Sequence, residues 1–285
     1  MDIEDILHDK VRKFSKGQRR LLEYIEKNFD KAAFMTAASL GKTVGVSEST
    51  VVRFAVELGF DGYPEMRKAL QEVVRNRLTS VQRIEVAREF LNGEDLFRRV
   101  LNSDIEKLQN TLSEFDSGSF SAAADAIYSA KNIYVVGMRS SSALSSYFSF
   151  YMHLLRDGVH QIHDTDMSNV YEQLMRIESG DLYIALSFPR YTSAALNAAR
   201  FAKERGASIL VLTDNPSSPF TEQADTVLYA KSDMVSFVDS LVVPMSVLNA
   251  LIVAVSAKNP QLLEENFQSL EKIWNQYGVF FGNES

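Results

Sequence analysis

The chain has 285 residues, of which 46% are hydrophobic and 24% are charged, with 13 glycines, 6 prolines and no cysteine. This is the composition of an ordinary globular protein of roughly one to three domains, and it excludes collagen-like and low-complexity chains. Because cysteine is missing, disulfides, thiol nucleophiles, zinc fingers and iron–sulfur clusters are excluded as well. The first ten residues are acidic and lack an apolar signal core, so we expect a cytoplasmic protein.

The net charge of -7 is distributed unevenly along the chain. Residues 1–83 carry 15 basic and 12 acidic residues (net +3), whereas residues 84–285 carry 15 basic and 25 acidic residues (net -10). Residues 10–20 hold six basic residues and no acidic one. A basic N-terminal part followed by an acidic remainder indicates that the N-terminal part binds a polyanion. The alternative is a solvated helix face, which the net charge alone does not exclude.

The first ninety residues are predicted to be helical. Apolar residues at helical spacing predict helices over residues 18–29, 35–44, 47–58 and 63–78. Thr36 and Ser47 occupy N-cap positions, Gly59 occupies a left-handed C-cap position, and Pro64 lies in the first turn of the last helix. The second and third helices, joined by a tight turn at Gly45, form a predicted helix-turn-helix.

In a helix-turn-helix, the second helix enters the major groove and presents its N-terminal half to the base edges. The candidate DNA-binding residues are Ser47, Ser49, Thr50, Arg53 and Lys42. Hydroxyl groups contact bases or phosphates, and arginine binds a guanine or a phosphate. We therefore predict double-stranded DNA as the partner, with a helical scaffold that binds another protein as the alternative.

The other side of this second helix is predicted to pack against its neighbours. Its apolar residues are Val46, Val51, Val52 and Phe54. We expect all four side chains to hold the helix in place.

Residues 40–70 resemble the N-terminal helix-turn-helix of the RpiR family of bacterial transcriptional regulators. The resemblance is carried by the pattern S-x-x-T-V-x-R-F, which starts at Ser47, and by L-G-F-x-G-Y, which ends at Tyr63. Gly41 departs from the family, which usually has alanine there. Glycine permits close packing and costs about 1 kcal/mol of helix propensity, so the fold is expected to be the same.

Beyond residue 92 the hydrophobic period changes. Helices are predicted over residues 94–110 and 120–129, followed by apolar strands at 133–136, 159–162, 182–187, 209–213 and 226–229. Helices at 142–156, 168–177 and 192–205 alternate with these strands. Near-continuous apolar strands are typical of a parallel sheet that is covered on both faces. We predict an all-α helix-turn-helix domain (1–78), a helical linker (79–92) and an α/β doubly wound parallel-sheet domain (93–285).

Residues 240–257 form an uncharged stretch of 18 residues, which is short for a membrane span and is interrupted by Pro244 and Asn249. We interpret it as a helix that is buried in the core or at a subunit interface, and we predict no membrane partner.

Two loops are predicted at the carboxyl edge of the sheet, where ligands bind in doubly wound folds. Each loop precedes a helix, so its amides and hydroxyls favour an anion. Serines that merely cap helices are the alternative. Because both loops also carry an arginine, we favour an effector site. Its candidate residues are Arg139, Ser140, Ser141, Ser187, Arg190, Tyr191 and Thr192.

These loops are similar to those of the SIS (sugar isomerase) domain, a flavodoxin-like domain that follows the helix-turn-helix in the RpiR family. Together the two resemblances cover about residues 15–230. The SIS resemblance implies a phosphosugar ligand, which is held by a G-x-G-x-S loop and an S-x-S-G-x-T loop. Gly137, Ser141, Ser187 and Thr192 match those patterns.

The second glycine of the first loop is replaced by Arg139, and the Ser-Gly pair of the second loop is replaced by Pro189 and Arg190. Glycine adopts positive φ without cost, whereas arginine and proline do not. In exchange, the site gains two guanidiniums that can bind an anion bidentately. We expect an anionic, sugar-derived effector, with the arginines partly replacing backbone contacts. The alternative is that they pair with Asp164 or Asp166.

The resemblance also implies a homodimer or homotetramer, and a two-fold dimer would bind a pseudo-palindromic operator. The alternative function is a sugar-phosphate isomerase, which needs a positioned base. Glu172 is the candidate base, and His153 is expected to pack within a helix. His160 and His163 are three residues apart on or after a strand and so point to opposite faces. We predict no catalytic residue, metal or cofactor.

Overall fold

The computed structural model describes residues 14–75, 81, 83–84, 95–163, 167–232 and 238–280. The chain divides into two compact units, Met1–Gly93 and Glu94–Ser285. Apart from residues 81, 83 and 84, the linker predicted at 79–92 lies outside the described residues. Its helical character stays a prediction.

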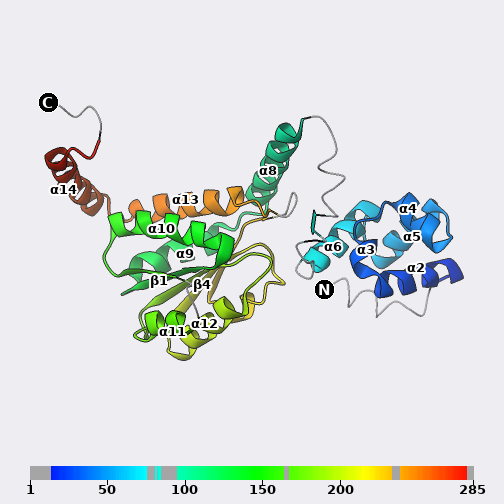
Figure 1. Cartoon of the computed structure of the whole chain (residues 1–285), viewed down its shortest axis with the longest axis horizontal. Coiled ribbons are helices and arrows are strands. Elements are labelled where there is room, and N and C mark those ends of the chain that lie inside the picture. The colour runs from blue at the N-terminus through cyan, green and yellow to red at the C-terminus, as the bar shows by residue number, and fades with distance from the viewer. Residues whose placement is uncertain are drawn as a thin grey trace. The chain divides into compact units, whose positions relative to one another are not determined.

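The N-terminal unit consists of helices in the part that the structure describes: α2 (Lys16–Lys27), α3 (Phe29–Ala32), α4 (Ala37–Val44), α5 (Glu48–Leu58) and α6 (Tyr63–Arg75) (Figure 1). The N-caps predicted at Thr36 and Ser47 are confirmed, since their side chains accept hydrogen bonds from the amides of Ser39 and Thr50. Helix α2 begins at residue 16 rather than 18, because Ser15 and Gln18 form a reciprocal capping box. The short helix α3 was not predicted.

The packing face of α5 differs in one residue from the prediction. Val51 and Phe54 are buried as expected, together with Ala55 and Leu58. The expectation for Val52 is wrong, because its side chain is 39% exposed. At 3.6 residues per turn, positions 51, 54, 55 and 58 share one side of a helix and position 52 faces away from it.

Tyr63 joins the start of α6 to the segment before α4. Its hydroxyl donates a hydrogen bond to the carbonyl oxygen of Met35 at 2.8 Å. Burial raises the pKa of this tyrosine to about 12, so the hydroxyl keeps its proton at neutral pH. The last residue of the L-G-F-x-G-Y pattern therefore has a structural role.

The C-terminal unit alternates helices and strands. It opens with α8 (Leu96–Ser113) and α9 (Ser117–Ser129). The alternating part contains β1 (Ile133–Gly137), a 3₁₀ turn η2 (Arg139–Ser141), α10 (Ser142–Leu155), β2 (Val159–Ile162), α11 (Met167–Leu174), β3 (Leu182–Leu186), α12 (Ser193–Glu204), β4 (Ser208–Thr213), η3 (Thr221–Gln223) and β5 (Thr226–Tyr229). Each of the five predicted strands is present, with bounds that differ by at most one residue.

All five strands are parallel, in the order β2-β1-β3-β4-β5. Helices α9, α10 and α13 (Val242–Ser256) cover one face of the sheet, and α11 and α12 cover the other (Figure 1). Two apolar clusters, one on each face, form the core. The predicted fold class is confirmed. Chain order reverses between β1 and β3, and this switch point is where ligands bind in such sheets.

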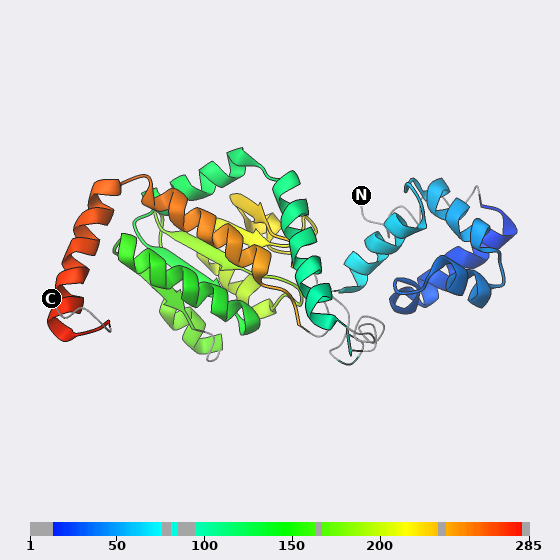
Figure 2. The same ribbon diagram turned by 90° about the horizontal axis from the view of Figure 1, so that it is seen from above.

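The uncharged stretch at 240–257 forms α13, which lies beside α10 (Figure 2). The next helix, α14 (Pro260–Tyr277), was not predicted, and none of its residues is buried. Within the described residues, no single helix has the length and apolar composition needed to cross a membrane. Taken together, α13 and α14 meet that test, but the pair is bent by 101°.

Candidate functional site

The turn between α4 and α5 depends on two glycines. Gly45 is left-handed, with φ of 72°, and beyond it the amide of Val46 donates a hydrogen bond to the carbonyl oxygen of Gly41 at 2.8 Å. A Cβ atom on Gly41 would lie only 2.8 Å from the carbonyl oxygen of Val46. The departure at Gly41 therefore suits a turn that packs closely against α4.

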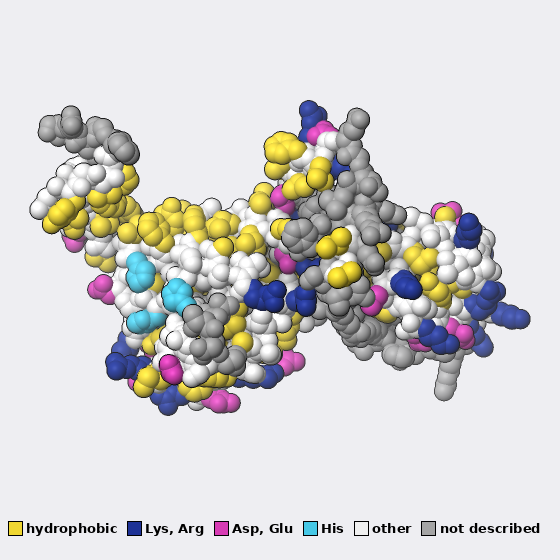
Figure 3. Space-filling model, in the orientation of Figure 1, with side chains coloured by type: hydrophobic (Ala, Val, Ile, Leu, Met, Phe, Trp, Pro, Cys, Tyr) yellow, Lys and Arg dark blue, Asp and Glu magenta, His cyan; other side chains and the backbone are white. Residues whose placement is uncertain are grey.

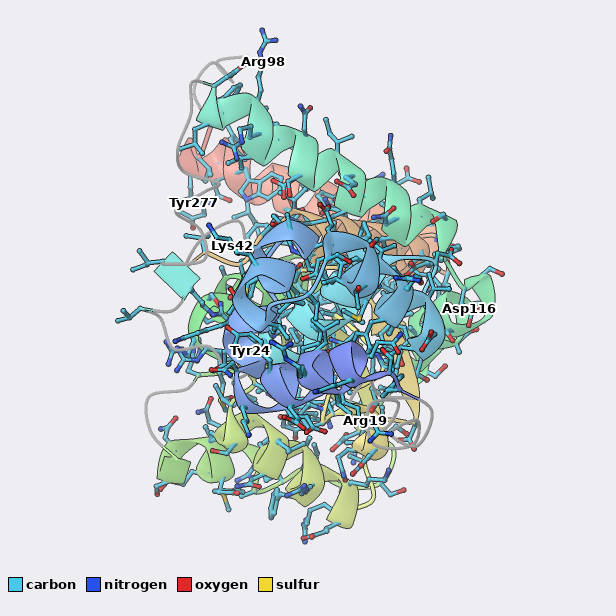
Figure 4. The ribbon with its side chains drawn as sticks, turned by 90° about the vertical axis from the view of Figure 1, so that its right-hand side faces the viewer. Arg19, Tyr24, Lys42, Arg98, Asp116 and Tyr277 are labelled. Carbon is cyan, nitrogen blue, oxygen red and sulfur yellow. The ribbon has the colours of Figure 1, made fainter. Side chains whose placement is uncertain are left out.

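Arg20 holds this turn from α2. Its Nη1 donates to the carbonyl oxygen of Gly45 at 3.5 Å, and its Nη2 donates to that of Val44. The guanidinium thus satisfies carbonyls at the C-terminus of α4, where a cation is favoured. Arg19, labelled on α2 in Figure 4, donates from Nε to the carbonyl oxygen of Phe14 at 3.1 Å. Sequence reasoning placed both arginines in a polyanion-binding run and missed these backbone contacts.

The structure brings the predicted DNA-binding residues of α5 together at its exposed N-terminal end. The hydroxyl oxygen of Ser47 lies 2.9 Å from that of Ser49 and 2.8 Å from that of Thr50. Arg53 lies one turn further along α5, where its Nε donates to the carbonyl oxygen of Ser49 at 3.3 Å. Hydroxyls, a guanidinium and a helix N-terminus on one surface suit a phosphate or a base edge.

Lys42 is exposed on α4, in the helix that precedes the turn (Figure 4). A lysine there adds positive charge without base-specific geometry.

The second candidate site lies at the carboxyl ends of β1 and β3. These strands pair directly, with Gly137 opposite Leu186. The turn η2 folds back over the end of β1, so a Cβ atom on Gly137 would lie 2.2 Å from the carbonyl oxygen of Ser141. Only glycine fits at the end of this strand, because the first loop folds back tightly against it.

Arg139 adopts the backbone conformation that a glycine would favour, with φ of 55°. We expected that conformation to cost free energy for an arginine, and the loop nevertheless has the conformation at Arg139. The left-handed region costs roughly 1–2 kcal/mol for a residue with a side chain. The loop thus carries a guanidinium at a position whose backbone conformation favours glycine.

The second loop continues β3 and is joined to the first loop by Thr192. This residue caps α12 by accepting a hydrogen bond from the amide of Ala195 at 3.4 Å, and it donates to the sulfur of Met138 at 3.4 Å. Ser187 is buried, and its amide donates to the carbonyl oxygen of Leu212 at 3.1 Å. The hydroxyl of Tyr191 donates to a carboxylate oxygen of Asp214.

Asp214 is a site residue that sequence reasoning missed. It follows β4 and is 2% exposed. Besides the hydroxyl of Tyr191, its oxygens accept hydrogen bonds from the side chains of Thr213 at 3.4 Å and Asn215 at 2.6 Å. The signal in the sequence is the polar run that directly follows an apolar strand, and it marks the same sheet edge as the two predicted loops.

The predicted effector residues differ in how far they reach solvent. Ser141 and Ser187 are buried, Tyr191 and Thr192 are half-buried, and Arg139, Ser140 and Arg190 are exposed. Exposed guanidiniums around buried hydroxyls, beside the start of α10 and α12, suit a polyol that carries a negative group. Asp164 and Asp166, the alternative partners of the arginines, lie outside the described residues.

The candidate base Glu172 is exposed on α11, where its carboxylate accepts a hydrogen bond from the hydroxyl of Ser168 at 3.1 Å. His153 is exposed rather than packed, and His160 stacks on Tyr134 with ring centroids 4.8 Å apart. His160 and His163 line one surface pocket together with His153, so the expectation that the two point to opposite faces is wrong. The histidines visible in Figure 3 lie near one another. No group of three or more metal-ligating residues was found among the described residues.

Two family models match the chain. Residues 1–77 match the helix-turn-helix domain of the rpiR family, and residues 126–254 match the SIS domain. HexR of Pseudomonas aeruginosa, an HTH-type transcriptional regulator, is 26% identical over 258 residues, which is 88% of each chain.

Two solved structures are also similar. The sugar isomerase domain of an RpiR transcription factor from Sphaerobacter thermophilus is 28% identical, with a TM-score of 0.60 over 63% of this chain and 99% of that chain. The NanR protein of Vibrio vulnificus, complexed with ManNAc-6P, has a TM-score of 0.59 over 99% of this chain and 100% of that chain. Its identity is 21%, so this similarity shows the fold alone.

Arg139→Gly is expected to raise the free energy of unfolding of the C-terminal unit by up to about 1.5 kcal/mol. It removes a left-handed cost of roughly 1–2 kcal/mol and adds about 0.5–1 kcal/mol of glycine entropy. Urea unfolding of the two proteins measures the difference. The control is Arg200→Ala, an exposed arginine of α12, which should change stability little. A clear decrease in the free energy of unfolding of Arg139→Gly would contradict the claim that the left-handed backbone at this position is costly for arginine.

Proposed function

The chain belongs to the RpiR family of transcriptional regulators and carries a SIS domain, and on that basis we propose a two-part function. Helix α5 binds a pseudo-palindromic operator in double-stranded DNA. The carboxyl edge of the sheet binds an anionic, phosphorylated sugar metabolite, and this effector alters operator binding. The observation that carries the proposal is the meeting of two hydroxyl-rich loops, each with an arginine, at the β1–β3 switch point.

The DNA-binding proposal is supported by the exposed surface of α5. Ser47, Ser49 and Arg53 are all exposed, so they reach a ligand without a change of fold. The turn that orients α5 is fixed by Gly45 and by the guanidinium of Arg20. A rigidly held helix is what recognition of base edges requires.

The effector proposal is supported by charge and by shape. Arg139 and Arg190 supply positive charge at the rim, while Ser141 and Ser187 supply hydroxyls below it. The bound ManNAc-6P of the NanR structure is a phosphorylated sugar, and it is a ligand of that protein. The carboxylate of Asp214 accepts three hydrogen bonds from side chains, one of them from Tyr191, and so ties the second loop to the end of β4.

We further propose that the C-terminal unit forms a homodimer or homotetramer through α13. The side of α13 that leaves the core carries no charged residue, and Val242 and Val253 are 41% and 66% exposed. Figure 3 shows apolar side chains gathered along the layer of α10 and α13. Such a surface is typical of an interface between subunits. Two copies related by a two-fold axis would present two recognition helices to the operator.

The effector would act by binding one arrangement of the two DNA-binding units more tightly than another. A ligand that binds both arrangements with equal affinity does not change their relative populations. A change from 1% to 99% occupancy needs about 5.5 kcal/mol of discrimination between the two states.

Arg53→Ala is expected to weaken specific DNA binding by about 5- to 150-fold, the effect of losing one base-reading or phosphate-binding arginine. Competition gel shifts on the upstream region of its own gene, repeated at several salt concentrations, measure the loss. The matched control is Arg176→Ala, an exposed arginine of the C-terminal unit. If Arg53→Ala binds the same DNA as tightly as the wild type, α5 does not read DNA through this residue.

Arg190→Ala is expected to raise the Kd for a phosphosugar by roughly tenfold or more, because a charge-assisted hydrogen bond is lost. Calorimetry of the full chain against N-acetylmannosamine 6-phosphate and other hexose phosphates measures it. The matched control is Arg200→Ala. Absence of wild-type binding across the panel, or unchanged binding by Arg190→Ala, would overturn the effector proposal.

Val253→Asp is expected to dissociate the homo-oligomer, because it places a charge in an apolar interface. Light scattering after gel filtration should give the wild type a multiple of the 32.0 kDa chain mass and the variant a mass close to one chain. The control is Met175→Asp, since Met175 is 62% exposed at the end of α11, on the opposite face of the sheet. A wild type that elutes as a monomer would disprove the interface.

A further inference from the structure

The outward side of α5 carries two exposed aliphatic residues. Among the side chains that the structure describes within residues 14–75, the large hydrophobic ones that face solvent are Val52, which is 39% exposed, and Val56, which is 52% exposed. Both lie on α5, four residues apart. The other large apolar side chains described in this range are buried or half-buried, and further along the unit Val81 and Ile84 are also exposed.

These valines are not part of the core-facing side of α5. Val51, Phe54, Ala55 and Leu58 form that side, and all four are buried. The valines share a second stripe at i, i+3, i+4 and i+7, which consists of Ser49, Val52, Arg53 and Val56, and all of its members are exposed. Because the fold gains nothing from exposed aliphatic groups in water, this stripe suits a surface that has both polar and apolar features.

The major groove of DNA has those features. Base edges present hydrogen-bond donors and acceptors, and the C5-methyl group of thymine is the apolar group among them. Arg53 lies between the two valines along the stripe, so a polar contact and two apolar contacts would fall on adjacent parts of the groove. Side chains at i and i+4 are about 5–6 Å apart at Cβ, and successive base pairs are about 3.4 Å apart. The two valines therefore span one to two base-pair steps.

We propose that Val52 and Val56 form a binding site for thymine methyl groups in the operator half-site. This inference rests on the proposed function, in which α5 enters the major groove. It adds a sequence preference: each half-site has A·T pairs whose thymines face the valines, beside the pair or phosphate that Arg53 contacts. Each buried methyl group should contribute about fourfold to the affinity, which is the value for transfer of one such group out of water.

The test begins with selection of bound duplexes from a random DNA library by the full chain. Each thymine of the selected operator is then replaced in turn by deoxyuridine, which removes the methyl group and keeps every hydrogen-bonding group. We expect at least two thymines in each half-site at which this replacement raises the Kd of the wild type by about fourfold.

Val52→Ser and Val56→Ser identify the valine that contacts each methyl group. In Val52→Ser, deoxyuridine should no longer raise the Kd at one of the two thymines but should still raise it at the other. Val56→Ser should show the reverse pattern. Each variant is thus the matched control of the other. Because both side chains are exposed, thermal unfolding of the variants should match that of the wild type.

The outcomes separate the two proposals. Suppose that the chain selects a specific operator but that deoxyuridine raises the Kd at no thymine, or raises it equally in the wild type and both variants. The methyl-binding site is then wrong, while DNA binding by α5 is not contradicted. Unchanged operator binding by both variants would also disprove the site, and would fit a protein partner on this stripe. If the chain selects no specific DNA sequence, both the methyl-binding site and operator binding by α5 are disproved.

Discussion

The parallel pairing of β1 with β3 places two strand ends, Gly137 and Leu186, side by side although they are 49 residues apart in the sequence. At the end of β1, Gly137 lets η2 fold back within a distance that no side chain would permit. At the end of β3, Thr192 caps α12 and contacts Met138 in the neighbouring loop. Both loops that carry the candidate effector residues leave the sheet at this junction. In the N-terminal unit, the left-handed Gly45 orients α5, so each proposed site depends on a glycine, for close approach at Gly137 and for positive φ at Gly45.

Local sequence signals account for most of the fold. Thr36 and Ser47 are recognisable as N-caps because a hydroxyl precedes an apolar helical stripe, and the strands are recognisable as short apolar runs. The capping box of Ser15 and Gln18 was missed, since two polar residues in a basic run carry little apolar pattern around them. Helix α14 was missed because none of its residues joins the core, although apolar residues recur along it at helical spacing.

The sites were predictable only in part, because their geometry is not local. The loops after β1 and β3 could be paired once a parallel sheet was predicted, but the contribution of Asp214 depends on β4 lying next to β3. Likewise, Arg20 looks like any basic surface residue until α2 is placed beside the end of α4. Val52 was assigned to the wrong side of α5 because an apolar residue was taken to face the core, whereas its position on the helix lies outside the buried stripe. The left-handed backbone of Arg139 also breaks a local rule, and such exceptions gather at functional sites.

The central claim is that a phosphorylated sugar at the sheet edge and operator DNA at α5 bind to one molecule with coupled affinities. Coupling of this kind is reciprocal: the factor by which the sugar changes the Kd for DNA equals the factor by which DNA changes the Kd for the sugar. The most direct test is fluorescence anisotropy of a labelled operator duplex, titrated with the full chain at zero and at saturating phosphosugar, together with the converse titration. The account predicts a change of roughly 5- to 150-fold in each direction, with equal factors. Identical operator affinity with and without a sugar that binds would contradict it.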